Sequence, residues 1–265
     1  MQIYTIASGS GGNCTLLCDG KASFLIDAGI SARRISHALS SLGKSPNELS
    51  GILITHEHGD HVCGLKTLTK QFEVSIFAPR TVANHLRWSI AGVDNFITEL
   101  SAGKEFYIDG VSVLPFLTPH DTPESVGYRI SGSRVFGFCT DCGHVTTEMR
   151  EGMSGAHAVM IEANYDLEML KNGSYPQFLK RRVLSDRGHL SNESCGEFAL
   201  SLYDSGAEKI ILAHLSRENN TPDLALKTVS SAFTREGINS ADGPQIFVAP
   251  EKDIFPISLE EVPLC

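Results

Sequence analysis

The sequence contains no long apolar segment and no leader-like N-terminus. No stretch approaches the ~18–20 uninterrupted apolar residues that a membrane-spanning helix needs. The first residues, Met1 to Ile6, lack the basic region and apolar core of a secretory signal. We therefore expect a cytoplasmic protein without a membrane partner.

Cysteine is also scarce for a disulfide-stabilised protein. The seven cysteines are an odd number and are scattered over the chain, which argues against a disulfide framework. Cys139 and Cys142 have C-x-x-C spacing, but the sequence has no second such pair to complete a four-cysteine metal site. We expect reduced thiols that pack around Asp141, which lies between them.

Positive charge is in short supply as well. There are 22 lysine and arginine residues against 31 aspartate and glutamate residues, and the formal net charge is −9. This balance argues against a general nucleic-acid binder, because phosphate backbones are held by cations. However, Lys180, Arg181, Arg182 and Arg187 form a local basic run, and bound divalent metals would add positive charge. The charge weakens a nuclease hypothesis without excluding it.

No repeat, low-complexity segment or linker divides the chain, so we expect one domain over residues 1–265. β-rich segments occur in two runs, each followed by helical segments. This order predicts an α/β fold, a four-layer αββα sandwich, with a metal site at the edge where the two sheets meet. The expected strands are 3–6, 15–18, 23–26, 52–54, 74–78, 105–108, 111–116, 125–130, 134–139, 158–161 and 209–213. One expected helix starts near Ser31, and the others cover 82–90, 166–171, 175–184, 191–203 and 221–233.

The most informative stretch is His56-Glu57-His58-Gly59-Asp60-His61, which follows an apolar, β-rich segment. A strand that ends in a polar, glycine-containing turn can direct several side chains at one point. Three imidazoles and a carboxylate would lose hydration there at high cost unless a cation compensates. Nitrogen and oxygen ligands of this kind suit zinc, manganese or iron.

Three further residues follow predicted strands in the same way, and they are His120, Asp141 and His214. Together they supply the ligands that a two-metal site would still lack. Two cations roughly 3.5–4 Å apart can share a hydroxide, because metal binding lowers the pKa of water to about 7. The carboxylates of Asp27 and Asp121 could orient the imidazoles, although a turn or capping role is an equal alternative.

These residues resemble the metallo-β-lactamase superfamily, whose pattern is H-x-H-x-D-H followed by separate His, Asp and His residues. The resemblance spans most of the chain and implies a hydrolase with two divalent ions, Zn²⁺, Mn²⁺ or Fe²⁺. It implies that one ion is bound by His56, His58 and His120. It implies that the other is bound by Asp60, His61 and His214, with Asp141 bridging the two.

A second segment, from Arg187 to Glu193, places a histidine just before an expected helix. Helix N-termini favour phosphate oxygens, so His189, Ser191 and Asn192 are candidate phosphate-binding residues. Arg217 is a further candidate, because it follows a predicted metal ligand by three residues and can form forked hydrogen bonds. A solvated residue before a helix is the alternative interpretation of His189.

Glu162 lies in Ile161-Glu162-Ala163-Asn164-Tyr165, which resembles the H-E-A-T stretch of tRNase Z-type phosphodiesterases. In that group the Glu acts with an additional His, which implies that Glu162 pairs with His189 here. A carboxylate keeps an imidazole charged, so His189 could protonate a leaving alkoxide. We expect Asp60, Glu162 and His189 to be the catalytic residues.

A closer resemblance is to the YycJ/WalJ-type exonucleases, whose S-G-S-x-G-N-C segment appears at residues 8–14. Residues 188–192 and 214–220 match the same group. The resemblance implies a dinuclear-metal phosphodiesterase that acts as a 5′ DNA exonuclease. A metal-bridging hydroxide would make an in-line attack on phosphorus.

The main alternative is a small-molecule hydrolase, either a glyoxalase II-like thioesterase or a lactonase. Such an enzyme needs the same metal ligands but has no need for a pair of Glu162 and His189. Tyr165 and Tyr175 are candidate rings for stacking on bases, whereas Phe178 is expected to pack in the core. The tail from residue 243 to 265 could complete a sheet or mediate a homodimer.

Overall fold

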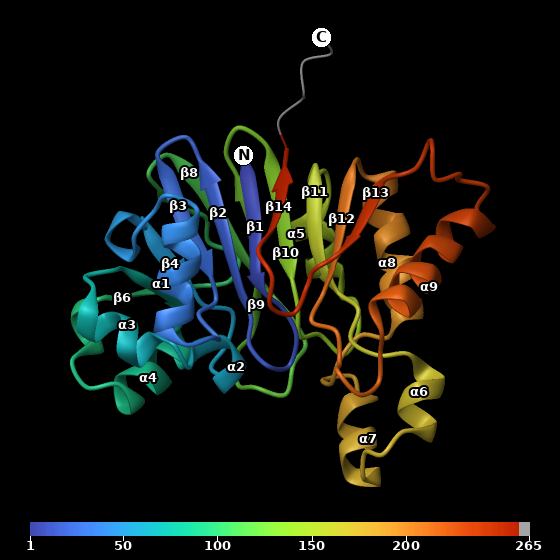
Figure 1. Cartoon of the computed structure of the whole chain (residues 1–265), viewed down its shortest axis with the longest axis horizontal. Coiled ribbons are helices and arrows are strands. Elements are labelled where there is room, and N and C mark those ends of the chain that lie inside the picture. Colours follow the sequence, from blue (N-terminus) through green and yellow to red (C-terminus); the bar gives the residue numbers. More distant parts are fainter. Residues whose placement is uncertain (260–265) are drawn as a thin grey trace.

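Two β-sheets pack face to face and carry helices on their outer sides (Figure 1). The computed structural model describes residues 1–259, and within them each sheet has seven strands. The predicted four-layer αββα sandwich is therefore confirmed. Among the described residues, no helix is long and apolar enough to cross a bilayer.

The first sheet has the strand order β14-β1-β2-β3-β4-β5-β6. Its strands are β1 (Gln2–Ala7), β2 (Cys14–Asp19), β3 (Ala22–Ile26), β4 (Gly51–Leu53), β5 (Ile76–Pro79), β6 (Ile97–Leu100) and β14 (Phe255–Ser258). The pairs β14·β1, β1·β2 and β2·β3 are antiparallel, whereas the pairs β3·β4, β4·β5 and β5·β6 are parallel.

The second sheet has the order β13-β12-β11-β10-β9-β8-β7. Its strands are β7 (Phe106–Ile108), β8 (Val111–Leu117), β9 (Val126–Ser131), β10 (Val135–Cys139), β11 (Ala158–Glu162), β12 (Lys209–Ala213) and β13 (Gln245–Val248). Strands β7 to β10 are antiparallel and β10 to β13 are parallel. Asp109 and Gly110 join β7 to β8 with φ of +47° and +86°, the left-handed values that a two-residue hairpin turn requires.

The outer layers contain α1 (Ala32–Ser41), α3 (Leu65–Gln71) and α4 (Arg80–Ser89) on the first sheet, and α5 (Thr147–Met153), α8 (Asn192–Asp204) and α9 (Pro222–Arg235) on the second. The remaining helices are α2 (Gly59–Val62), α6 (Leu167–Asn172) and α7 (Gln177–Val183), with 3₁₀ turns at Pro46–Glu48 and Val93–Asn95. Ser31 accepts the Arg34 N–H to cap α1, and Thr221 caps α9 with Pro222 in its first turn.

Alternating side chains connect these layers. In β3, Phe24 and Ile26 point into the core between the sheets, whereas Leu25 packs under the helices of the first sheet. In β12, Ile211 faces the central core and Ile210 faces α8 and α9. Strands buried on both faces are expected to be apolar throughout, which explains why these segments were recognisable in the sequence.

Strands β13 and β14 each form an outer strand of one sheet, so this part of the tail completes both sheets, which is one of the two roles expected for it; residues 260–265 lie outside the described part of the chain. Other elements differ from the expectation. The sequence did not predict α2, α3, α5 or β6. The predicted core role of Phe178 is wrong, because its side chain on the short helix α7 is 74% exposed.

Candidate metal centre

Three histidines from two strand ends come together at one end of the sandwich. His56 and His58 follow β4, and His120 follows β8. Nε2 of His56 lies 3.1 Å from Nδ1 of His58, which in turn lies 3.3 Å from Nε2 of His120. Three imidazole nitrogens this close to one another could hold one metal ion.

A second group lies beside the first. Asp60 and His61 stand on the one-turn helix α2, and His214 follows β12. Oδ2 of Asp60 is 3.6 Å from Nε2 of His61 and 3.5 Å from Nε2 of His214. Asp141, after β10, reaches both groups: its Oδ1 is 3.8 Å from Nε2 of His120, and its Oδ2 is 3.3 Å from Nε2 of His61. The carboxylate therefore lies where a bridging ligand would have to be.

We call these side chains the candidate metal cluster; its members are His56, His58, Asp60, His61, His120, Asp141 and His214. Oδ2 of Asp141 and Nε2 of His214 are buried without a hydrogen-bond partner among the described residues. Such atoms are rare in native proteins because each one costs free energy. A divalent cation would satisfy both atoms, and imidazole with carboxylate is a donor set that suits Zn²⁺, Mn²⁺ or Fe²⁺.

The backbone at this edge is unusual. Asp27, Asp141 and His214 have φ of +61°, +57° and +56°, in the left-handed region that residues other than glycine rarely adopt. Each of them follows a strand. Cys139 and Cys142, on either side of Asp141, are buried free thiols, as the sequence predicted.

Buried polar groups hold the cluster in place. Oδ2 of Asp27 lies 2.7 Å from Nδ1 of His61, and its Oδ1 accepts the N–H of Thr55 at 2.9 Å. Burial raises the pKa of Asp27 although His61 opposes this effect. For His61, burial alone would lower the pKa, but Asp27 and Asp141 raise it to about 10. These contacts favour the orienting role of Asp27 over the alternative role in a turn or cap.

The glycine-rich opening segment has a positioning role that the sequence did not reveal. The hydroxyl of Ser8 accepts the N–H of His214 at 2.8 Å. Nδ2 of Asn13 lies 3.1 Å from Nε2 of His61, and the Asn13 N–H donates to the carbonyl of Asp60. Gly29 lies so close to Asp60 that a Cβ atom would be 1.6 Å from its carbonyl oxygen. The segment thus fixes the second half of the cluster.

Glu162 and His189 form a pair at the edge of the cluster. Oε1 of Glu162 lies 2.7 Å from Nδ1 of His189 and 2.8 Å from Nδ1 of His214. Burial alone would raise the pKa of Glu162, but His189 and His214 hold it below its usual value. For His189, burial alone would lower the pKa, but Glu162 raises it above its ordinary value. The pairing implied by the sequence resemblance is thus present in the structure.

A cavity of about 230 Å³ opens over the cluster. Of the four residues predicted to bind phosphate, His189 lines it. The prediction for Asn192 is wrong, because its side chain is fully buried and its amide pairs with Asn220. Ser191 caps α8 by accepting the Ser194 N–H, and Arg217 pairs with Glu251 beside an adjoining cavity.

The other residues that line the cavity are Ser10, Asn164, Tyr175, Leu179, Arg182, Val183 and Ser216. Tyr175 is one of the two tyrosines predicted to stack on bases, and Arg182 belongs to the basic run. The remaining five were not predicted as site residues, although Ser10 and Ser216 lie within recognisable motifs. Nothing in the sequence indicated that α7 would lie beside the cluster.

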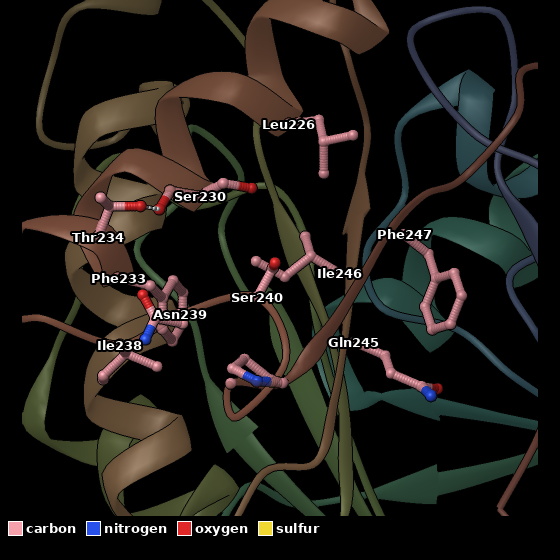
Figure 2. Close-up of a pocket in the computed structure, with 12 residues that line it drawn as sticks. Leu226, Ser230, Phe233, Thr234, Ile238, Asn239, Ser240, Gln245, Ile246 and Phe247 are labelled. Carbon is pink, nitrogen blue, oxygen red and sulfur yellow. Dashed lines mark hydrogen bonds between the residues drawn. The ribbon is translucent and has the colours of Figure 1, made fainter.

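A larger cavity of about 500 Å³ lies elsewhere, between α9 and β13 (Figure 2). Phe233 and Ile246 are among its lining residues, and no described lining residue is acidic, basic, histidine or cysteine. It therefore offers apolar surface without groups for hydrolytic chemistry. The smaller cavity over the cluster remains the candidate active site.

Comparison with known proteins agrees with this geometry. Residues 23–215 match the Beta-lactamase superfamily domain. Exodeoxyribonuclease YycJ of Bacillus anthracis is 34% identical over 250 residues, which cover 93% of this chain and 94% of that protein. Exodeoxyribonuclease WalJ of Streptococcus pneumoniae is 34% identical over 233 residues, covering 84% of this chain and 85% of that protein.

A solved structure shows the same fold. The metallo-β-lactamase fold protein YhfI from Bacillus subtilis superposes with a TM-score of 0.72 at 14% identity, covering 96% of this chain and 98% of that chain. At this identity the likeness concerns the fold alone. With the family match, the architecture and the clustered histidines and aspartates, this chain belongs to the β-lactamase superfamily and has the metallo-β-lactamase fold.

Proposed function

We propose that this chain is a single-domain, dinuclear-metal phosphodiesterase that removes nucleotides from the 5′ end of DNA. The observation that carries the proposal is the pair of Glu162 and His189 beside the candidate metal cluster. A thioesterase has no need for this pair, because its leaving thiolate departs without a proton, whereas cleavage of a phosphodiester requires a proton for the leaving alkoxide. Similarity to two exodeoxyribonucleases over most of the chain supports the choice of DNA.

The cluster would hold two divalent cations in the groups that the distances suggest. One group contains His56, His58 and His120, the other contains Asp60, His61 and His214, and Asp141 lies between them. When bound, such cations polarise a phosphate and supply hydroxide at neutral pH for in-line attack on phosphorus. Zn²⁺ and Mn²⁺ are the first ions to test, followed by Fe²⁺.

The chain's own side chains would supply the rest. Glu162 holds Nδ1 of His189, which leaves the opposite ring nitrogen, Nε2, to face the cavity and donate a proton to the leaving oxygen. Asp60 would fix the second cation and share in aligning the attack, because its carboxylate lies between His61 and His214. Asp27 and Glu162 keep the rings of His61 and His214 from rotating, and Ser8 fixes the backbone of His214.

The test is a comparison of substrates with protein loaded with Zn²⁺ or Mn²⁺. We expect 5′-phosphorylated DNA labelled at its 3′ end to give progressively shorter labelled strands, with labelled mononucleotide appearing only at the end, and to be degraded faster than the matching RNA. A glutathione thioester serves as the alternative substrate. Thioester hydrolysis without phosphodiester hydrolysis would replace the proposal by the small-molecule hydrolase, and progressive shortening from the 3′ end would reverse the polarity.

A further inference from the structure

One wall of the cavity over the cluster comes from outside the metal motifs. Tyr175, Leu179 and Arg182 line the cavity together with histidines of the cluster. They belong to the segment that contains α6 and α7, which projects beyond the sheets at the same end of the sandwich as α2 (Figure 1). We call residues 166–184 the arm.

The arm is held firmly although it projects. Tyr165, Leu170 and Val183 form a small core of their own, with Tyr175 and Leu179 packed against it. The ammonium group of Lys180 donates to the carbonyl of Lys171 at 2.7 Å and so joins α7 to α6. The N–H of His189 donates to the carbonyl of Val183 at 3.0 Å. The end of α7 is therefore fixed to the proposed proton donor.

Arg182 lies at the end of this wall. Its Nε donates to Oδ2 of Asp121, whose other carboxylate oxygen lies 3.3 Å from Nε2 of His120. The arginine side chain is still 53% exposed. Within residues 1–259 the hydrogen bond of this side chain leaves from Nε, so both terminal nitrogens of the guanidinium remain available as donors. Asp121 thus holds the Arg182 guanidinium beside the cavity, and this guanidinium can still donate hydrogen bonds to a ligand.

The neighbouring arginines are placed differently. Arg181 is exposed and, among the described residues, is not part of the cavity wall. Arg187 donates to the carbonyl oxygens of His120 and Thr122, at 2.7 and 2.6 Å, and so stabilises their loop. Arg182 combines access to the cavity with free donors.

We propose that the arm binds the nucleic-acid strand: Arg182, oriented by Asp121, binds the phosphate next to the one being cut, and Tyr175 packs against the nucleotide between them. This inference rests on the proposed nuclease function. The phosphate being cut must lie on the cations, and the Asp121 carboxylate lies between Arg182 and His120. The next phosphate along the strand is therefore the one that the guanidinium can reach. The ligand is a polynucleotide strand rather than a diester with a single phosphate.

Arg182→Gln and its matched control Arg181→Gln test the phosphate contact, since both variants lose one charge on the same helix. The substrate is a 5′-phosphorylated single-stranded oligonucleotide. For R182Q we expect KM to rise about 10–100-fold, as for loss of one charge-assisted hydrogen bond. We also expect the slope of log affinity against log salt concentration, measured by anisotropy with a phosphorothioate-linked oligonucleotide, to fall by about 0.7. R181Q should retain wild-type values.

Two further readouts separate binding from structural damage. R182Q should hydrolyse bis-p-nitrophenyl phosphate, which has one phosphate, like the wild type, and should retain its metal content. Equal behaviour of R182Q and R181Q on DNA would overturn the proposal. Parallel loss of metal or of bis-p-nitrophenyl phosphate hydrolysis in R182Q would do the same, because the arginine would then only support the cluster. If the wild type cleaved no phosphodiester, the proposed function itself would fail.

Tyr175→Leu tests the aromatic contact, with Phe178→Leu as the control. Phe178 lies on the same arm but is exposed and is not among the described residues of the cavity wall. Stacking of a base on an aromatic ring is worth about 1–3 kcal/mol, so we expect KM for the oligonucleotide to rise about 5–100-fold in Y175L alone. Equal KM values for the two variants would remove Tyr175 from the proposed contact.

Discussion

Nδ1 of His189 and Oε1 of Glu162 lie 2.7 Å apart, and the same oxygen also lies 2.8 Å from Nδ1 of His214. The other carboxylate oxygen accepts the N–H groups of Cys142 and Leu190. Glu162 is fully buried, so its orientation is fixed by these four partners. One carboxylate therefore supports both the proposed proton donor and a proposed metal ligand.

Replacing His189 and Glu162 should have separable effects. We expect His189→Ala to retain its metal and to lower the rate of DNA cleavage by about 10²–10⁴-fold, the range for loss of a general acid. Glu162→Gln should in addition weaken metal binding about 10–100-fold, because it also supports His214. Steady-state rates and metal content by mass spectrometry measure both effects. A wild-type rate in H189A would return His189 to the role of a solvated residue before a helix.

Asp27→Asn should weaken metal binding without disturbing the backbone. Asparagine tolerates the left-handed φ of this position, but it removes the charge that holds Nδ1 of His61. We expect about 10–100-fold weaker affinity for one of two Zn²⁺ ions, measured by competition with a chromogenic chelator. Asp19→Asn is the control, since Asp19 bonds to Ser133 away from the cluster. Equal affinities in the two variants would contradict a role for Asp27.

Zinc binding should release protons from the metal-free protein. Nearby carboxylates raise the pKa of His61 to about 10 and that of His214 well above its ordinary value, against the lowering effect of burial. The His61 ring therefore carries an extra proton at pH 7.5, which it must lose before its nitrogen can coordinate, and the raised pKa of His214 acts in the same direction. We expect release of at least one proton and an affinity that rises with pH towards 10. Calorimetry in buffers of different ionisation enthalpy measures this, and heats independent of the buffer would rule it out.

Two glycines near the cluster should differ in their tolerance of alanine. At Gly29 a Cβ atom would overlap the carbonyl oxygen of Asp60, whereas at Gly59 it would meet no atom within 4 Å. We expect Gly29→Ala to lose about 1–3 kcal/mol of stability or more, together with part of its metal. Gly59→Ala should retain both, although Gly59 lies inside the histidine motif. Thermal unfolding and metal analysis test the pair, and equal stability would show that the loop around Asp60 can relax.

Much of the site could be predicted because its residues follow strands. His120, Asp141 and His214 each come after an apolar segment that proved to be β8, β10 or β12. The alternation and composition of those strands are local properties, and strands that run in the same direction end at the same edge of a sheet. The histidine motif at residues 56–61 then indicated at which edge of the sheets the site lies.

The remaining features depend on contacts between distant segments. Arg181 and Arg182 are neighbours in the sequence, and only the packing of α7 decides which of them reaches the cavity. Asn192 precedes its partner Asn220 by 28 residues, so its burial could not be read from the helix start alone. Strands β13 and β14 have only four residues each, and they are stabilised by pairing with β12 and β1.

The left-handed backbone at Asp27, Asp141 and His214 has a consequence for the history of this fold. Each such residue costs roughly 1–2 kcal/mol that glycine would not incur. Glycine, however, offers no side chain with which to bind a cation or orient a ligand. Selection for catalysis and selection for a relaxed backbone therefore oppose each other at these positions. A descendant released from catalysis is free to accept glycine there, so glycine at these three places would mark a lineage that has lost its hydrolase activity.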